Sequence, residues 1–177
     1  MSFRRFIPFL VAFVLPLFVI YAWWGGFNSV EIAPAQVRGP YVYAYVEHTG
    51  DYAKLPDRQA KVEQTLLNAK VPLGHGITVL YSNPDTVKIG DRVARIGYLV
   101  PAGTKVYEPL KVDTIPARPV LLAKVRSAVL LAPSRAYQAL DDYLQAKGQG
   151  IRMPTVEIYE TSASPFAMGT LYVEMPE

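Results

Sequence analysis

Glu157 and Tyr159 lie two residues apart in segment 154–159, PTVEIY, which has the composition of a buried β-strand. Because side chains alternate along a strand, Val156 and Ile158 should point to one face and Glu157 and Tyr159 to the other. A carboxylate beside a phenol suits an organic cation, since an aromatic face attracts a cation by roughly 0.5 to 2 kcal/mol. We therefore predict helices on the Val156 face, a pocket on the opposite face, and Glu157 as the principal functional residue.

A buried carboxylate needs an explanation, because an unpaired one costs several kcal/mol. A cationic ligand is one explanation, and an internal ion pair of Glu157 with Lys124 or Arg126 is another. A third is catalysis, in which Glu157 is a general base and Tyr159 a proton donor in the hydrolysis of an electrophilic small molecule. That role requires the base within about 2.6 to 3.2 Å of the proton that it takes, and the sequence leaves this geometry open.

Tyrosines are concentrated after the first 27 residues, in a region that contains eleven of the twelve tyrosines and neither tryptophan. Tyr43 and Tyr45 belong to an alternating segment, 41–47, whose other face consists of small apolar residues. Tyrosine combines an apolar ring with a hydroxyl, which suits a pocket for flat or cationic ligands. Tyrosine is also common in strands for reasons of packing alone, so both interpretations stand at this point.

Charge and composition limit the classes of partner. The formal net charge is +3, and two of the cations, Arg4 and Arg5, precede an apolar segment, so the remaining domain is close to neutral. Such a domain offers no electrostatic surface for nucleic acid. The absence of cysteine excludes disulfides and thiolate metal sites. His48 and His75 are too far apart in sequence, and have too few acidic neighbours, to indicate a metal site. We expect no metal and no cofactor.

The N-terminal segment 6–24 contains 19 residues without a charge, enough to cross a hydrocarbon core of about 30 Å. We predict a transmembrane anchor over 1–25. Arg4 and Arg5 favour a cytoplasmic N-terminus, and therefore a single-pass protein of the inner membrane with its domain on the periplasmic or extracytoplasmic side. A cleaved or twin-arginine signal peptide is the alternative, although Tyr-Ala-Trp-Trp occupies the place where a cleavage site needs small residues.

The pattern after the anchor predicts a tether over 26–39 and one domain over 40–177. Hydrophobic periodicity and turn residues divide this domain into strands and helices. We expect strands at 41–47, 77–81, 92–100, 104–107, 119–126, 155–160 and 169–175, and helices at 55–70 and 133–147.

This order repeats itself. The spacing from Tyr45 to Lys124 is 79 residues and that from Tyr81 to Tyr159 is 78, which indicates an internal duplication. The predicted fold class is α+β, with duplicated β-α-β-β units at about 40–101 and 117–177, pseudo-twofold symmetry, and helices on one face of the sheet. In this alignment Val79 is the counterpart of Glu157.

The two first strands of the repeats share a small apolar face but differ on the other face. We expect a concave ligand-binding groove between those second faces, lined by Tyr41, Tyr43, Tyr45 and Glu47 from one repeat and by Val120, Leu122, Lys124 and Arg126 from the other. The same alignment predicts a Glu47–Arg126 salt bridge between neighbouring central strands.

Three short motifs support a family resemblance: GPY at 39–41, HTGDY at 48–52 and P-x-x-E-x-Y at 154–159. With the paired β-α-β-β pattern, they resemble the GyrI-like small-molecule-binding family, whose fold is that of the AraC-type effector-binding domain, over about 37–176. The N-terminal span and the stretches VLYSNP and YVEMPE are most similar to the membrane-anchored branch, typified by the animal testis-expressed autophagy receptor of the endoplasmic reticulum.

The resemblance implies roles for particular residues. It places the family's pocket acid at Glu157 and a pocket tyrosine at Tyr159, with Tyr81 at the equivalent position of the first repeat. It implies a binding module for a small amphipathic or cationic ligand in a tyrosine-lined groove. Tyr43 and Tyr45, from the alternating segment that lines the predicted groove, complete the ligand residues, and no catalytic residue is assigned. The alternatives are the hydrolase and a protein-interaction module at the membrane with a filled pocket.

Overall fold

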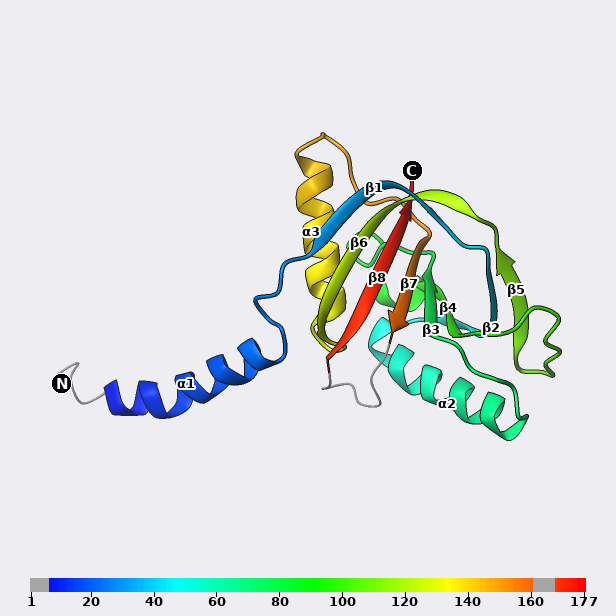
Figure 1. Cartoon of the computed structure of the whole chain (residues 1–177), viewed down its shortest axis with the longest axis horizontal. Helices are drawn as coiled ribbons and strands as arrows, with labels where there is room; N and C mark the ends of the chain where they lie inside the picture. Colours follow the sequence, from blue (N-terminus) through cyan, green and yellow to red (C-terminus); the bar gives the residue numbers. More distant parts are fainter. Residues whose placement is uncertain (1–6, 161–167) are drawn as a thin grey trace.

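The computed structural model describes residues 7–160 and 168–177. Helix α1 comes first, and the remaining elements form an α+β domain, as predicted (Figure 1). The elements are α1 (Ile7–Trp23), β1 (Glu31–Arg38), β2 (Tyr41–Thr49), α2 (Leu55–Asn68), β3 (Gly76–Leu80), β4 (Val93–Leu99), β5 (Lys111–Ile115), β6 (Arg118–Ala128), α3 (Ala132–Gln145), β7 (Thr155–Glu160) and β8 (Met168–Pro176).

The strands form one eight-stranded antiparallel sheet in the order β1-β6-β8-β7-β3-β4-β2-β5. The order has the same pattern from either end, with the junction of β7 and β3 at its centre. One unit therefore comprises β1-β2-α2-β3-β4 and the other β5-β6-α3-β7-β8. The sheet order has the pseudo-twofold pattern that the duplication predicts.

Each unit contributes its first strand to the other unit. Strand β1 pairs with β6, and β5 pairs with β2. The sequence prediction missed both strands: it described 26–39 as a tether and placed a strand at 104–107 instead of 111–115. Both are edge strands whose residues are mostly exposed, so they lack the apolar alternation that identifies a half-buried strand.

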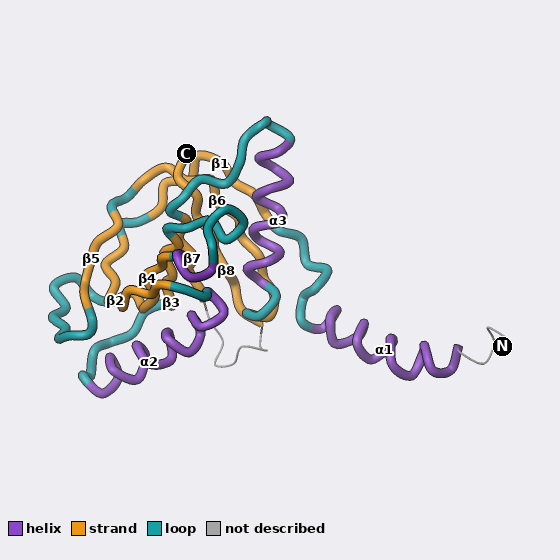
Figure 2. Tube along the Cα trace, turned by 180° about the vertical axis from the view of Figure 1, so that it is seen from behind, coloured by secondary structure: helices purple, strands orange, loops and turns teal. Residues whose placement is uncertain are grey.

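Helices α2 and α3 lie on one face of the sheet, here called the helix face. Helix α2 packs on β2 and β4 and α3 on β6 and β8, so the helices lie apart, one against each unit (Figure 2). Their buried stripes include Val62 and Leu66 from α2, and Leu140 and Leu144 from α3. The predicted small apolar faces of β2 and β6 pack against these helices. The residues are Val42, Ala44 and Val46 beneath α2, and Leu121, Ala123 and Val125 beneath α3.

The opposite face, here called the inner face, is covered by the curl of the sheet itself. Only Gly39 and Pro40 separate β1, at one edge, from β2, near the other edge. The hydroxyl of Tyr41 on β2 donates to Glu174 on β8 at 2.7 Å, although three strands separate β2 from β8 in the sheet order. The inner face is therefore packed against itself, and Tyr43 is only 1% exposed.

Helix α1 extends away from the sheet (Figure 1), and its apolar side chains are mostly exposed. Its C-terminal end is tied to the β6–α3 connection: Ala128 N donates to Trp24 O at 2.9 Å and Arg135 Nη1 to Gly25 O at 2.7 Å. Gly25 has φ +73°, and a Cβ there would lie 2.9 Å from Arg126 O, so glycine is required.

The predicted transmembrane span is not found among the described residues. Helix α1 has 17 residues, and within 7–160 and 168–177 no helix is long and apolar enough to cross a membrane. Arg4, Arg5 and Phe6, which contributed to that prediction, lie outside the described residues.

Candidate functional site

Glu157 lies in the middle of β7 on the helix face, where it is 6% exposed. The hydroxyl of Tyr159 donates to its Oε2 at 2.7 Å, and Tyr137 of α3 provides a second phenol hydrogen bond. The hydroxyl of Tyr137 also lies 2.7 Å from Thr155 Oγ1. A single carboxyl group is thus held between phenols from the sheet and from α3.

The predicted alternation of β7 is confirmed, but its assignment to the two faces is wrong. Val156 and Ile158, expected beneath the helices, pack on the inner face with the Tyr43 cluster. Glu157 and Tyr159 point to the helix side, where Tyr159 packs against the α3 core. The inner face is also apolar, because the sheet curls over it. The aliphatic side of β7 therefore did not indicate which face of the sheet the helices cover.

The predicted repeat alignment also assigned residues to the wrong face of the sheet. On the paired strands β3 and β7, Thr78 lies directly opposite Glu157, and Val79 lies opposite Val156. A spacing of 79 relates Thr78 to Glu157 and keeps both on the helix face. A spacing of 78 relates Val79 to Glu157 and changes the face. Thr78, and not Val79, therefore lies opposite Glu157 and on the same face of the sheet.

The alternative explanation, an internal ion pair of Glu157 with Lys124 or Arg126, is not found among the described residues. Among residues 7–160 and 168–177, no lysine or arginine makes a salt bridge with Glu157. Lys124 instead lies 3.9 Å from Glu31, an exposed acid of β1. Within the described residues, the ionised form of Glu157 is therefore stabilised by hydrogen bonds and not by a salt bridge.

The electrostatics follow from this burial. Burial raises the pKa of Glu157, while the hydrogen bonds from Tyr159 and Tyr137 oppose that rise. Burial and the neighbouring carboxylate raise the pKa of Tyr137 and of Tyr159 well above the usual tyrosine range. Both phenols remain hydrogen-bond donors, and a cation placed beside Glu157 would favour the ionised carboxylate.

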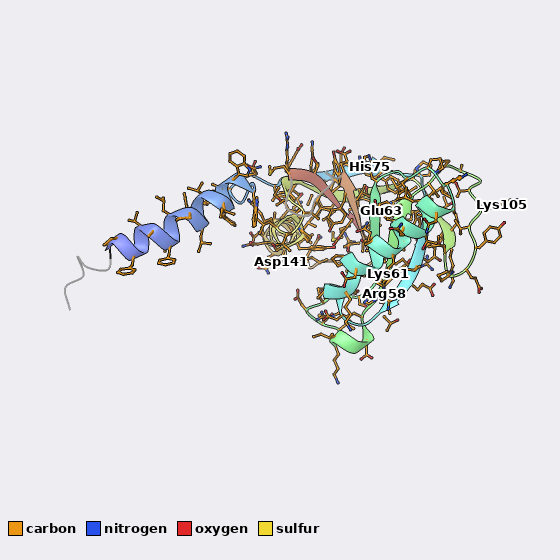
Figure 3. The ribbon with its side chains drawn as sticks, turned by 90° about the horizontal axis from the view of Figure 1, so that it is seen from below. Arg58, Lys61, Glu63, His75, Lys105 and Asp141 are labelled. Carbon is orange, nitrogen blue, oxygen red and sulfur yellow. The ribbon has the colours of Figure 1, made fainter. Side chains whose placement is uncertain are left out.

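A cavity of about 280 Å³, here called the Tyr137 cavity, lies beside this group. Tyr137 lines the cavity and also bonds to Glu157, so it separates the carboxyl group from the open space. Asp141 of α3 (Figure 3) and Asp85 also line it, without any lysine or arginine. The remaining lining residues are Leu80, Asn83, Pro84, Gln138, Ile151 and Met153.

Tyr43, Tyr45 and Tyr81 lie on the inner face around Arg95 of β4. The Arg95 guanidinium lies 4.6 Å from the Tyr45 ring centre and 5.3 Å from that of Tyr81, and its Nη1 donates to Tyr43 Oη at 3.2 Å. It also forms a 2.6 Å salt bridge with Asp113. The tyrosines expected to bind a cation therefore already surround a cation of the chain itself.

The five predicted ligand residues thus divide between two faces of the sheet. Glu157 and Tyr159 lie together on the helix face, whereas Tyr43, Tyr45 and Tyr81 lie together on the inner face. The two groups cannot line one groove. The sequence prediction did not include Tyr137. The feature that could have indicated it is its position in α3 directly after Ala136, which is buried.

The predicted Glu47–Arg126 salt bridge is wrong. Glu47 lies 3.2 Å from Lys111 and 3.9 Å from Arg95. Strands β2 and β6 are separated by four strands in the sheet order, because the pseudo-twofold arrangement places each of them next to an edge of the sheet and not at its centre.

A second buried acid, Glu174 of β8, lies on the inner face and is fully buried. Arg38 Nε and Arg118 Nη2 lie 3.0 and 3.1 Å from its two oxygens, and the Tyr41 hydroxyl donates to it at 2.7 Å. The structure gives Glu174 a structural role in tying β1, β6 and β2 to β8.

Comparisons of the sequence with family models and with curated proteins give no match. The fold, however, is shared with solved structures. The chain of an EcmrR–DNA complex, solved by cryo-EM, superimposes with a TM-score of 0.66 at 11% identity, covering 98% of this chain and 67% of that chain. The crystal structure of the EcmrR C-terminal domain gives 0.60 at 14% identity, covering 84% and 94%.

A third structure of this fold contains a ligand. SAV2435 bound to tetraphenylphosphonium has a TM-score of 0.53 at 10% identity, and the match covers 83% of this chain and 93% of that chain. These similarities are in the fold alone, and they are consistent with the GyrI-like fold that the sequence resemblance implies.

Proposed function

We propose that this chain is a binding module for a small organic cation or cationic amphiphile, which it binds next to Glu157 on the helix face. One observation carries the proposal: a buried carboxyl group that only phenol groups stabilise within the described residues. Such a group costs free energy when ionised, and a bound cation would offset that cost. The tetraphenylphosphonium complex of SAV2435, a protein of the same fold, supports a bulky organic cation.

The Tyr137 cavity provides the route to Glu157. At about 280 Å³, it is slightly smaller than the usual range for ligand pockets, about 300 to 1,000 Å³. Rotation of the Tyr137 side chain would enlarge it and expose the carboxyl group. Asp85 and Asp141 would attract a cation to the entrance, and the rings of Tyr137 and Tyr159 would then contact it through their faces.

This proposal retains the tyrosine-lined pocket but changes its tyrosines. Tyr137 and Tyr159 replace Tyr43, Tyr45 and Tyr81, whose aromatic faces already contact Arg95. The acid predicted from the sequence, Glu157, keeps its proposed role as the counter-ion.

Isothermal titration calorimetry with tetraphenylphosphonium tests the proposal. Glu157→Gln keeps the size of the side chain but removes its charge, and we expect affinity to fall by about tenfold or more, equivalent to about 1.4 kcal/mol. Glu160→Gln is the matched control, because Glu160 lies on the same strand but is exposed and on the inner side of the alternation. Equal affinity in the wild type and in Glu157→Gln would reject the proposal.

A hydrolase is the second candidate, and the geometry of one hydrogen bond favours it. The Tyr159 hydroxyl lies 2.7 Å from Glu157 Oε2, which is within the range for proton transfer, and a raised carboxyl pKa suits a general base. Turnover of an electrophilic substrate that disappears in both Glu157→Gln and Tyr159→Phe would establish this activity. Binding without turnover would leave the module as a receptor.

We also propose that α1 holds the domain at the inner membrane, with the domain on the periplasmic side. The support is the exposed apolar surface of α1, which includes Phe13 and Leu17, and the two arginines that precede it in the sequence. Phe13→Glu with Leu17→Glu should release the protein from sedimenting membranes, whereas Tyr107→Glu, at a residue 85% exposed, should not. An inactive periplasmic reporter fused after Glu177 would contradict the orientation.

A further inference from the structure

A second cavity, of about 370 Å³, lies between α2 and the start of β5, where β5 crosses onto β2. It is here called the α2–β5 cavity. Its lining consists of Val46, Glu47, Arg58, Lys61, Val62, Thr65, Pro109, Leu110 and Lys111. None of these residues lines the Tyr137 cavity, so the two cavities are separate.

The base of the α2–β5 cavity is apolar. Val62 is 2% exposed and Leu110 is 5% exposed, and both belong to the core cluster beneath α2, with Val46 packed against it. An aliphatic or aromatic group entering the cavity would therefore leave water for an apolar surface, which is favourable.

The edge of the α2–β5 cavity is cationic. Arg58 and Lys61 lie along α2 (Figure 3), and neither forms a salt bridge within the described residues. Lys111 Nζ lies 3.2 Å from Glu47, so the one acid in the lining is already paired. The two cations of α2 are left to attract an anion, and a guanidinium binds carboxylate, sulfonate or phosphate oxygens with two hydrogen bonds.

We infer that the α2–β5 cavity is a binding site for an organic anion with an apolar body. The anionic group is held between Arg58 and Lys61, and the apolar body lies on Val62 and Leu110. This site has the opposite charge preference to the Tyr137 cavity and does not depend on it. The chain accordingly has two separate sites, one beside α2 and one beside α3, with opposite preference for ligand charge.

The test uses the full chain and 8-anilinonaphthalene-1-sulfonate, an organic anion whose fluorescence rises on transfer to an apolar site. The double variant Arg58→Gln, Lys61→Gln should weaken its saturable binding by about tenfold, because two favourable charge interactions are lost. Thr65→Phe keeps both cations but fills the cavity, and it should weaken binding as well. Added tetraphenylphosphonium should not displace the probe.

The matched control is Lys88→Gln, Lys105→Gln, which removes the same charge from two lysines that do not line the cavity. Binding by this control should equal that of the wild type. An equal loss in the control would show non-specific attraction to surface charge, and full binding by Thr65→Phe would show that the probe lies elsewhere. Displacement by tetraphenylphosphonium would place the probe in the other cavity. Each of these results overturns the inference.

Discussion

Glu157 and Glu174 are two buried acids on neighbouring strands, and their surroundings differ in one respect. Glu174, on the inner face, lies within 3.0 to 3.1 Å of two guanidinium groups and accepts from Tyr41. Glu157, on the helix face, is held by phenols, one of which, Tyr137, lines a cavity. The chain supplies the counter-ions of Glu174 itself, so that acid stabilises the fold. Glu157 has no counter-ion among the described residues, so a positively charged ligand would be favoured there.

Removing the counter-ions of Glu174 should have the largest effect. Arg38→Met with Arg118→Met would leave a fully buried carboxylate unpaired, and we expect the free energy of unfolding to fall by about 3 to 5 kcal/mol. Urea denaturation at neutral pH measures this. Lys124→Met is the control, because its partner Glu31 is exposed and 3.9 Å away, and it should cost at most about 1 kcal/mol. A loss of that small size in the double variant would contradict the structural role of Glu174.

The difference between the two acids also shows what the sequence could predict. Strand β7 lies at 155–160, as predicted, and the helices were located within a few residues, because their patterns are local. The partner of each strand is not a local property. The exchange of β1 and β5 between units curls the sheet, buries the inner face and brings Tyr41 to Glu174. No spacing in the sequence indicates that exchange.

Only part of the site could be predicted, again because the pairing of strands is not a local property of the sequence. Glu157 was identified as a buried acid beside Tyr159, and both lie together. Tyr81 was aligned with Tyr159 by a spacing of 78 residues, but the two side chains lie on opposite faces of the sheet. Arg95 was missed because its role depends on β4 lying next to β2, where its guanidinium meets the tyrosines of the neighbouring strand.

The pH dependence of cation binding should be the next largest effect. Binding of a permanent cation such as tetraphenylphosphonium requires the ionised form of Glu157, whose pKa burial raises. Affinity should therefore fall as pH decreases through that raised pKa, by about tenfold for each pH unit below it, or about 1.4 kcal/mol. Calorimetry between roughly pH 5 and 8, in buffers of different ionisation enthalpy, would detect the proton that Glu157 releases when the cation binds.

In Glu157→Gln this pH dependence should disappear together with the proton release. A pH profile identical in the variant and the wild type would assign the titrating group to another residue.

The stability of the unliganded protein should show the opposite dependence on pH. Because the folded pKa of Glu157 is raised above its ordinary value of 4.5, the folded state binds more protons than the unfolded state in this range. The stabilising contribution is present below about pH 4.5 and is lost as pH rises through the raised pKa. The free energy of unfolding of Glu157→Gln should exceed that of the wild type increasingly over that interval, as measured by urea denaturation. A difference independent of pH would mean that Glu157 is ionised throughout.

The smallest expected effect is that of Tyr137→Phe, which keeps the ring at the cavity and removes the hydroxyl that bonds to Glu157 and lies 2.7 Å from Thr155 Oγ1. That hydrogen bond favours the ionised carboxylate, so its loss should raise the pKa of Glu157 further and cost about 0.5 to 1.5 kcal/mol of stability. Cation affinity at high pH should change little, because the ring face is retained, whereas the pH at which affinity falls should move upward. Tyr41→Phe, which removes a hydroxyl from Glu174, should leave that pH unchanged, because the hydrogen bonds that shift the pKa of Glu157 come from Tyr159 and Tyr137. An equal shift in both variants would show that the phenol beside Glu157 has no special influence on its charge.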